Sequence, residues 1–532
     1  MNRRRFVRTL GSSSVAMMLG LRGTRLWAQQ SPPQKELPIN CAPPSHGSPR
    51  PIRFDPSAPI KPRKSAWDLS QMELDRLNAA YQALRNLTTT DPNDPRGWMQ
   101  QANVHCFNCS GGYDPSNVEI HGSWWFLPWH RCYLHVHERI LGKLINDPTF
   151  RLPYWDWDTY PTHATLPPPY VPPGSLYDAY RGVTPTDVIP TDITGPAAMS
   201  NVLNIRSTSG FMGKLSHPSA NKYYPGALEN SPHGPVHLWS GWGGSVGGTD
   251  PKPVGCWYPN TAGGTPVDQS NNGCMDMGVL ATAAQDPIFF THHANIDRTW
   301  DQWLRMPHSQ GNPTASSWKS QRFNFYDENS EWISISIADV LDENEQKNLR
   351  YFYEPPTAAP PVMLESAPEE VPRRRTTLRS LQPLVVDGDE AQTAVGTAPH
   401  TRAVAIPAEH KSNLGTFAAA RGRASRRYVL HIDGFTLPPS EGTIVKVFVN
   451  EPNPATATSY SGSFVGIFSV VPSGPQHNHA VVRDAEFEIR PATAARISMA
   501  DELTVSIVPV LPNGQPPQRS SLTYQKIYLS VE

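Results

Sequence analysis

Histidine has the clearest chemical pattern in this sequence. The chain holds 18 histidines, and several of them gather in two groups. Neutral imidazole is a good ligand for copper, zinc and iron, so each group predicts a metal site. The first group is His105, His121 and His130, and the second is His233, His237, His292 and His293.

The spacing within each group indicates which elements must carry the ligands. His233 and His237 stand at i and i+4, so one helix would aim both rings at one ion. His293 lies on a later predicted helix and could complete a set of three. His121 and His130 would fall on opposite sides of one continuous helix. We therefore expect His121 in the loop before a helix and His130 on that helix.

Apolar periodicity predicts the helices that could position these side chains. They cover residues 68–87, 124–145 and 286–306. Residues 159–228 and 241–276 are rich in Gly, Pro, Ser and Thr, so we expect them to be mostly loop. The 56 prolines of the chain agree with long loops and extended segments.

The pattern changes in the C-terminal part of the chain. Residues 356–424 carry runs of proline, three successive arginines and small polar residues, a composition typical of a linker. Residues 425–532 instead alternate between apolar and polar side chains. This alternation predicts a small antiparallel β-sandwich with strands at 428–432, 444–449, 486–489 and 503–508.

Several motifs resemble those of tyrosinases and plant-type polyphenol oxidases. Residues 121–131 (HGSWWFLPWHR) are similar to the first copper motif of that family, and residues 286–298 (DPIFFTHHANIDR) to the second. Residues 232–237 (PHGPVH) and 152–157 (LPYWDW) fit as well. The resemblance spans roughly residues 40–350. It implies a mainly α catalytic domain, in which a four-helix bundle holds a dicopper site, followed by an antiparallel β-sandwich.

Carried over residue by residue, the resemblance implies a dinuclear, type 3 copper centre. In the family the second histidine of a His-His pair is the ligand, so His292 is expected to shape the site without binding metal. Two nearby histidines, His135 and His137, are interpreted as core groups or as groups that surround the ligands without binding metal, and His477 and His479 as solvated loop residues. Copper A would be held by His105, His121 and His130, and copper B by His233, His237 and His293.

The same resemblance assigns roles to three cysteines. Cys109 matches the cysteine that forms a thioether bond with the second ligand of copper A, here His121. A free or disulfide-bonded thiol is the alternative. Cys41 and Cys106 match a family disulfide that ties the N-terminal arm to the copper domain. The pairing of two further cysteines stays open: Cys256 and Cys274.

Four further positions bear on the substrate. Glu229 matches a glutamate proposed in the family to help deprotonate phenols, and this role is favoured over the alternative of a helix-start residue with no catalytic role. Gly234 stands where many tyrosinases have asparagine, which argues against strong hydroxylation of monophenols. Leu280 replaces a gating phenylalanine of some plant enzymes and predicts a more open pocket. Leu238 should line the entrance.

The implied function is a copper-dependent phenol oxidase. With O2 it would oxidise o-diphenols to o-quinones, and it could also act as a monooxygenase on monophenols. The alternatives are a haemocyanin-like O2-binding protein and an oxidase of a specialised phenol such as an o-aminophenol. Reversible O2 binding without phenol turnover would distinguish the carrier from the oxidase.

The resemblance also implies a domain order and a latent proenzyme. Residues 29–310 would form the catalytic domain, 311–355 a segment packed on it, and 425–532 a shielding domain that caps the copper pocket. Arg373, Arg374 and Arg375 would offer an activating protease a site in the linker. The alternative is that the sandwich is a permanent stability module.

The N-terminus and the overall charge indicate the compartment and exclude some partners. Residues 1–28 begin with paired arginines before an apolar run and resemble a twin-arginine signal, which predicts delivery by the twin-arginine export machinery to the periplasm or the extracellular space. A Sec signal or a weak anchor is the alternative. The net charge of −1 gives no electrostatic case for nucleic acid, and no membrane span is expected in the mature chain.

Overall fold

The computed structural model describes most of the chain after its first forty residues. The described residues are 41–109, 119–172, 176–178, 181–217, 222–241, 276–341, 348–357, 384–387, 392–406, 408–419, 427–437, 442–472, 481–517, 520 and 522–531. Several sequence predictions lie outside them: the signal at 1–28, Cys256, Cys274, His477, His479 and the arginines at 373–375.

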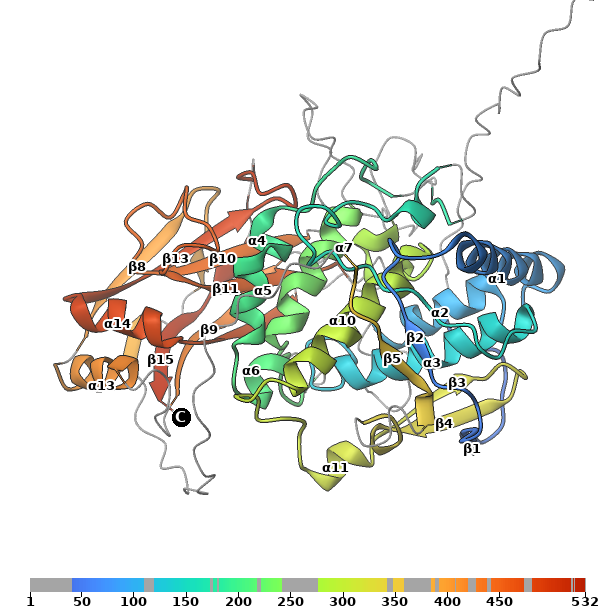
Figure 1. The fold of residues 1–532 in the computed structure, drawn as a ribbon. Helices are drawn as coiled ribbons and strands as arrows, with labels where there is room; N and C mark the ends of the chain where they lie inside the picture. The colour runs from blue at the N-terminus through green and yellow to red at the C-terminus, as the bar shows by residue number, and fades with distance from the viewer. Residues whose placement is uncertain are drawn as a thin grey trace, which may run out of the picture. The chain divides into compact units, whose positions relative to one another are not determined.

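The helical part of the chain is built on four long helices and the short helix α7, which Figure 1 labels. The three predicted helices are present, and α1 begins with a capping box between Ser70 and Glu73. A fourth, α2, was not predicted. The five are α1 (Gln71–Thr90), α2 (Trp98–Asn108), α3 (Phe126–Leu144), α7 (Gly234–Ser240) and α10 (Ile288–Leu304).

Shorter helices lie in the segments that were expected to be mostly loop, between the long helices, and after α10. They are α4 (Thr191–Thr194), α5 (Pro196–Leu203), α6 (Thr208–Met212), α9 (Leu280–Ala283) and α11 (Ser316–Lys319), with 3-10 turns at Pro168–Tyr170, Asp276–Gly278 and Ile337–Val340 and a π-helical turn at Glu229–His233.

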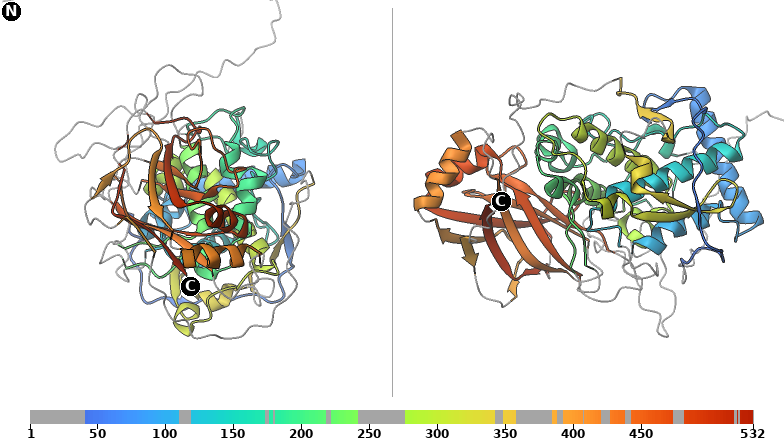
Figure 2. Two further views of the ribbon diagram at one scale, coloured as in Figure 1. Left: turned by 90° about the vertical axis from the view of Figure 1, so that its left-hand side faces the viewer. Right: turned by 90° about the horizontal axis from the view of Figure 1, so that it is seen from below.

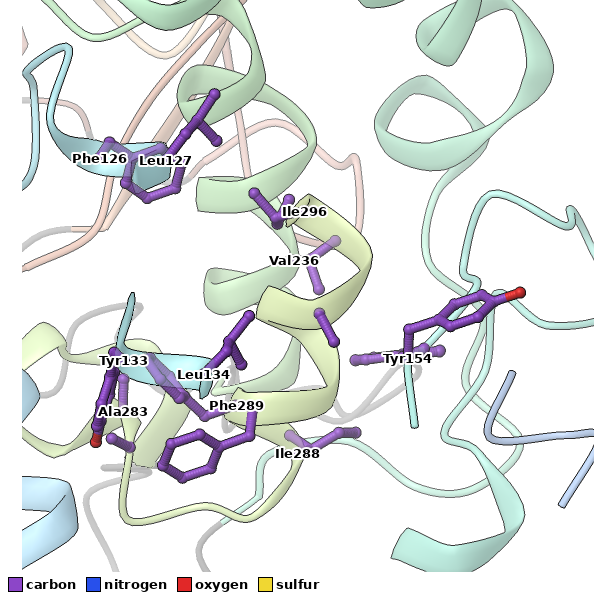
Figure 3. Close-up of a cluster of buried hydrophobic side chains, with 14 of the residues drawn as sticks. Phe126, Leu127, Tyr133, Leu134, Tyr154, Val236, Ala283, Ile288, Phe289 and Ile296 are labelled. Atoms are coloured by element: carbon purple, nitrogen blue, oxygen red, sulfur yellow. The ribbon is translucent and has the colours of Figure 1, made fainter. Parts of the chain in front are cut away.

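The core of the helical part lies where α3 packs against α10. Figure 3 shows Phe126, Tyr133 and Leu134 of α3 in one cluster with Phe289 and Ile296 of α10, and all five are buried. Burial of each such side chain contributes about 1.5–3 kcal/mol to folding. The helices that carry His130 and His293 are therefore held in a rigid frame.

Two small sheets fasten the N-terminal arm and the segment after α10. β1 (Arg50–Pro51) pairs in parallel with β4 (Trp332–Ser336), which pairs antiparallel with β3 (Arg322–Tyr326). β2 (Lys61–Arg63) pairs in parallel with β5 (Tyr351–Tyr353). Strand β3 in turn packs on α3, so residues 322–336 lie against the helical core.

The C-terminal part is a sandwich of two antiparallel sheets, with α13 (Ala408–Ala419) and α14 (Pro491–Met499) packed against each other beside them (Figure 2). Phe435 and Phe468 stack between the sheets with ring centroids 4.6 Å apart. One sheet has the order β11-β10-β13-β8 and the other β6-β15-β9-β14-β7, with β12 paired to β9. The strands not yet given bounds are β9 (Tyr428–Leu437), β10 (Thr443–Val449), β11 (Phe464–Val470), β12 (Val481–Glu488), β13 (Glu502–Val510), β14 (Thr523–Tyr524) and β15 (Lys526–Val531).

All four predicted strand segments lie in these sheets, but the predicted linker is wrong in its second half. β6 (Leu384–Asp387), β7 (Thr393–Ala394) and β8 (His400–Ala405) pair with β15, β14 and β13, and α13 follows them. These strands have only 4, 2 and 6 residues, so their sequence shows little alternation. They form because the longer strands offer them backbone partners.

In the described part of the chain, none of the helices is long and apolar enough to cross a bilayer.

Candidate metal centre

The grouped histidines come from four helices and one loop. His121 lies in the loop before α3 and His130 on α3, as predicted. His105 lies on α2 and His293 on α10. Extended backbone at Ser231 (φ −163°, ψ 131°) interrupts the turn Glu229–His233, after which α7 begins. His233 and His237 therefore stand at the start and in the middle of one helical segment.

The structure gathers these side chains into two buried clusters. His105, His121 and His130 form one, and their ring nitrogens lie within 4.8 Å of one another. His233, His237, His292 and His293 form the other, by the same measure. The six predicted ligands are at most 3% exposed.

The two clusters face each other across one shared space. The rings of His130 and His293 stack with centroids 4.0 Å apart, and those of His121 and His233 lie 6.0 Å apart. Two ions held by the two clusters would therefore be neighbours, as a dinuclear centre requires.

Backbone hydrogen bonds orient several of the rings. Nδ1 of His105 donates to the Leu280 carbonyl (2.8 Å), Nδ1 of His130 to the Phe126 carbonyl (2.7 Å) and Nδ1 of His237 to the Met277 carbonyl (2.9 Å). A neutral imidazole that donates from Nδ1 keeps its lone pair on Nε2. In these three rings Nε2 is therefore the atom that can bind a metal.

The buried Nε2 atoms test whether copper fits the site. Those of His105, His121, His130 and His233 have no hydrogen-bond partner among the described atoms. Buried polar atoms are normally satisfied, so four orphaned imidazole nitrogens in one place indicate that something else binds there. Imidazole ligands without a carboxylate suit copper, so the histidines present fit a pair of copper ions.

Burial keeps these imidazoles neutral. It lowers the pKa of His130 to about 3 and that of His237 to about 4, and it lowers the pKa of His105, His121, His233 and His293 well below the usual value. A neutral imidazole is the form that binds metal.

Hydrogen bonding distinguishes His292 from His293. Trp157 Nε1–H donates to Nδ1 of His292 (3.2 Å), so a neutral His292 carries its proton on Nε2 and has no second lone pair. Nε2 of His293 instead lies 3.2 Å from Nε2 of His237, so these two nitrogens converge. Of the two adjacent rings, His293 thus has the nitrogen that converges with that of His237; its role as the metal ligand stays a prediction.

His135 and His137 are buried in the core and belong to neither histidine cluster, so of the two predicted alternatives the structure supports the core position. His137 stacks on Phe290 with ring centroids 3.5 Å apart, and its Nδ1 lies 3.1 Å from Oε1 of Gln101. His135 packs near Phe54. Neither is among the grouped ligand atoms.

The predicted disulfide between Cys41 and Cys106 is present, with Cα atoms 5.8 Å apart. It ties the N-terminal arm to α2 at the residue next to His105. Cys109 is buried at the end of the same helix, and its thiol donates to the Cys106 carbonyl at 3.5 Å. The segment between Cys109 and His121 lies largely outside the described residues.

Glu229 lies close to the first cluster. Its Oε1 accepts a hydrogen bond of 2.6 Å from the backbone N–H of Gly122, the neighbour of His121. Its Oε2 is buried and has no partner in the described structure. Burial raises the pKa of Glu229 to about 8, while the Gly122 hydrogen bond and the charge of Arg483 act in the opposite direction. This carboxyl can therefore hold or release a proton near neutral pH.

The sandwich covers all three residues predicted to line the substrate pocket. A side chain at Gly234 would collide with Oγ of Ser469, which donates to the Asn230 carbonyl at 2.7 Å. Leu238 packs so closely on Gly442 that a Cβ there would collide with it. The third residue, Leu280, donates its backbone N–H to the Pro472 carbonyl at 2.8 Å.

Sequence reasoning missed one charged residue near the site, Arg483 of strand β12. Its guanidinium lies 4.3 Å from the ring centre of Tyr223, is nearly buried, and leaves Nη1 without a partner in the described structure. Its charge lowers the pKa of both His121 and Glu229. A shift of register in β12 just after Arg483 accompanies this placement. The only local signal for this placement in the sequence is the charged pair Arg483-Asp484 within an otherwise alternating strand.

Comparisons with known proteins agree with this geometry. The model of the common central domain of tyrosinase matches residues 95–202 and 186–306, and that of the polyphenol oxidase middle domain matches residues 312–361. These matches contain all the grouped histidines.

Individual relatives are plant polyphenol oxidases. The chloroplastic polyphenol oxidase of Malus domestica is 29% identical over 82% of this chain and 73% of its own length. The latent form from Prunus armeniaca is 33% identical over 60% of this chain and 52% of its own length. Against most of the curated relatives that it matches, the alignment spans about half of their length.

The matches to solved structures cover a larger share of the matched chain than the sequence matches do. The structure of latent apple tyrosinase has a TM-score of 0.68 at 25% identity, and the match covers 91% of this chain and 100% of that chain. That of Grenache (Vitis vinifera) polyphenol oxidase has a TM-score of 0.50 at 32% identity and covers 62% of this chain and 95% of that one. The chain therefore belongs to the tyrosinase family, as a polyphenol oxidase of the plant type.

Proposed function

We propose that this protein is a copper-dependent phenol oxidase that converts o-diphenols to o-quinones. In that reaction two o-diphenols each lose two electrons and two protons, and one O2 takes them up to give two waters. The observation that carries the proposal is the pair of facing, buried and neutral histidine clusters. As a second reaction at the same site we propose the hydroxylation of a monophenol and its oxidation to the o-quinone, in which one O2 is consumed and one water is formed.

The ligand assignment follows the hydrogen bonds of the rings. The donor of Trp157 occupies Nδ1 of His292, which leaves His293 as the third ligand from the second cluster. A pair of copper ions would supply the exchange of electrons with O2. Copper A would be held by His105, His121 and His130, and copper B by His233, His237 and His293.

Glu229 is proposed to handle the proton of the phenol. Its Oε1 is fixed by the Gly122 N–H, which leaves Oε2 as the atom that can accept a proton from an incoming hydroxyl. Burial keeps water away from this carboxyl. A positioned general base of this kind contributes about 10²–10⁴-fold to the rate.

Cys109 and His121 are proposed to be joined by a thioether bond. Both side chains are buried, and Cys109 follows the proposed copper A ligand His105 by four residues. The bond would lock the one copper A ligand whose ring nitrogens have no backbone hydrogen bond in the described structure. Formation of the bond is a two-electron oxidation in which the thiol and the imidazole each lose one hydrogen and one O2 takes up both, to give H2O2. The intact mass of the purified chain should therefore be about 2 Da lower than that of the Cys109→Ser variant after correction for the substitution.

We further propose that the protein is made latent and is exported. The contacts of Ser469, Gly442 and Pro472 with the three pocket residues leave little room for a phenol while the sandwich is in place. Because β6, β7 and β8 belong to the sandwich sheets, the activating cut is expected before residue 384, in the interval that contains the three arginines. Export by the twin-arginine machinery rests on the N-terminal sequence and is tested by the mass and location of the secreted chain.

The experiment that tests the activity compares metals. The full-length protein is first cleaved by a protease before β6 and is then loaded with two equivalents of copper or of zinc. The formation of o-quinone from an o-diphenol is followed by absorbance. Quinone formation with copper alone is expected, since zinc has no redox chemistry. Reversible O2 binding by the copper form without quinone would contradict the oxidase and support an O2 carrier.

A further inference from the structure

The carboxylate of Glu119 lies beside one of the proposed copper ligands. Its Oε1 accepts a hydrogen bond of 2.9 Å from the backbone N–H of His121, two residues later. The same Oε1 lies 3.8 Å from Nδ1 of the His121 ring. Glu119 is 4% exposed and His121 is 3% exposed, so the contact between them is shielded from water.

His121 differs from the other two proposed ligands of copper A. Nδ1 of His105 and Nδ1 of His130 each donate to a backbone carbonyl, which holds the ring and leaves Nε2 for a metal. Neither ring nitrogen of His121 has a hydrogen-bond partner in the described structure. Because His121 precedes α3, it has no helical turn before it that could supply a carbonyl, as Phe126 does for His130. Its ring therefore lacks the backbone support that the other two rings have.

Glu119 is the acceptor within reach of this ring. Among the six proposed ligands, His121 is the one that pairs with a carboxylate in the described part of the chain. The distance from Oε1 to Nδ1 exceeds that of a hydrogen bond by about 1 Å, so a small rotation of either side chain would close it. Glu119 is not among the grouped ligand atoms, so it would act on the ring and not on the ion itself.

A positive charge lies near this buried carboxylate. Arg483 lies against Gly122, in the loop before α3. Burial is the main cause of the raised pKa of Tyr223 and of Glu229; the charge of Glu119 adds to the rise, and that of Arg483 opposes it. The two charges thus act on the same groups with opposite sign. A cation nearby favours the ionised form of a buried carboxyl.

From this placement we propose that Glu119 is a positioning residue for copper A, whose carboxylate accepts the Nδ1–H of His121 and turns Nε2 toward the ion. A carboxylate acceptor also makes an imidazole a stronger ligand than the neutral carbonyls behind His105 and His130 do. The thioether proposed at Cys109 would attach to a ring carbon, so Nδ1 stays available to donate. The inference rests on the proposed dicopper site and gives its two ions unequal surroundings.

The test measures how tightly the full-length chain binds Cu(I) and Cu(II), each under argon and in competition with a chelator. Glu119→Gln keeps an oxygen for the His121 N–H and removes the charge. We expect one of the two Cu(II) ions to bind about tenfold more weakly in this variant. One Cu(I) should bind about threefold more weakly, since a singly charged ion feels half of the attraction to the carboxylate. Glu119→Leu, which also removes the acceptor, should weaken Cu(II) at that site about a hundredfold.

Glu73→Gln on α1 is the matched control. Glu73 also accepts a backbone N–H at 2.9 Å, that of Ser70, and lies outside both histidine clusters, so both affinities should stay unchanged. Equal affinities for Glu119→Gln and the unchanged chain would overturn the proposal. So would an equal loss for Cu(I) and Cu(II), because a purely structural acceptor does not distinguish the charge of the ion. Either result, with two coppers bound to the unchanged chain, leaves the proposed oxidase standing, whereas an unchanged chain that binds no copper would refute both.

Discussion

The backbone N–H of Leu280 donates a hydrogen bond of 2.8 Å to the carbonyl of Pro472. Pro472 comes shortly after β11 of the sandwich, whereas Leu280 begins α9 beside the metal site. The carbonyl of Leu280 in turn accepts from Nδ1 of His105 at 2.8 Å. Two successive hydrogen bonds thus connect the sandwich to a proposed ligand of copper A, so the placement of the sandwich and the orientation of that ring are coupled.

Weakening the hold of the sandwich should raise the activity of the uncut chain. Asp192 pairs with Lys446 (3.1 Å) and accepts from the backbone N–H of Ser459 (2.7 Å), both in the sandwich. Loss of a partly buried, charged hydrogen bond weakens such a contact by about 1.5–3 kcal/mol. Asp192→Ala should therefore raise quinone formation by the uncut chain up to about a hundredfold.

The control for that variant lies inside the sandwich. Asp501 pairs with Lys411 at 3.2 Å and is fully exposed, so Asp501→Ala should leave the uncut activity unchanged. After proteolysis the two variants and the unchanged chain should turn over at the same rate. A rise in both variants, or in neither, would contradict the assignment.

The two adjacent histidines of α10 should differ in copper binding. Because Trp157 fixes the proton of His292 on Nε2, His292→Gln should keep two coppers per chain, whereas His293→Gln should retain about one. Copper per chain, measured by atomic absorption after dialysis, checks both. The reverse result would show that the second cluster uses His292.

Glu229→Gln should separate metal binding from proton transfer. The amide keeps an oxygen that can accept from the Gly122 N–H, so the local structure and the copper content are expected to persist. Turnover should fall about 10²-fold or more, since the variant cannot take a proton from the phenol. Unchanged kcat with a monophenol and with an o-diphenol would leave Glu229 a purely structural residue.

Removing the disulfide should destabilise the fold. Cys41 and Cys106 close a segment with a sequence separation of 65, and loss of such a crosslink lowers stability by about 2–4 kcal/mol. Cys41→Ser should therefore melt at a lower temperature than the unchanged chain. Reductant should lower the melting temperature of the unchanged chain and leave that of the variant where it is. A variant as stable as the oxidised chain would show that the arm is held by its strand pairing alone.

Stability should respond to pH through Asp433 in the sandwich. Burial, together with the nearby charge of Asp484, raises the pKa of Asp433 to about 6, against the lowering effect of its hydrogen bond with Tyr528. A folded pKa above the unfolded value of about 3.9 means that this group favours folding at low pH and loses that contribution as pH rises through 6. Asp433→Asn should thus melt higher than the unchanged chain at pH 8, and the two should converge below about pH 4. An equal difference at both pH values would contradict this sign.

Prediction from sequence worked where the pattern is local. The helices that carry His130 and His293 have long apolar stripes, and the strands at 444–449 and 503–508 alternate clearly, so both kinds of element were found. Helix α2 was missed because its buried face includes polar residues such as Gln101, whose amide donates to the Pro95 carbonyl. The disulfide and the ligand candidates came from motif resemblance rather than from periodicity.

What could not be predicted depends on contacts between distant segments. Strands β6–β8 are too short to show a pattern and exist through their pairing with later strands. The approach of Ser469 to Gly234 joins residues far apart in the chain, and neither position has a local signal for it. The placement of Arg483 beside Gly122 and Tyr223 is also a contact between distant segments, and apart from the neighbouring charge of Asp484 the local sequence has no signal for it.

The most direct test of the account is oxygen uptake by the copper-loaded, full-length chain on an o-diphenol, measured before and after proteolysis between β5 and β6. The account predicts little uptake before the cut and rapid uptake after it, with two coppers bound in both states. Equal uptake before and after would show that the sandwich does not close the site. No uptake in either state, with both coppers present, would contradict the phenol oxidase itself.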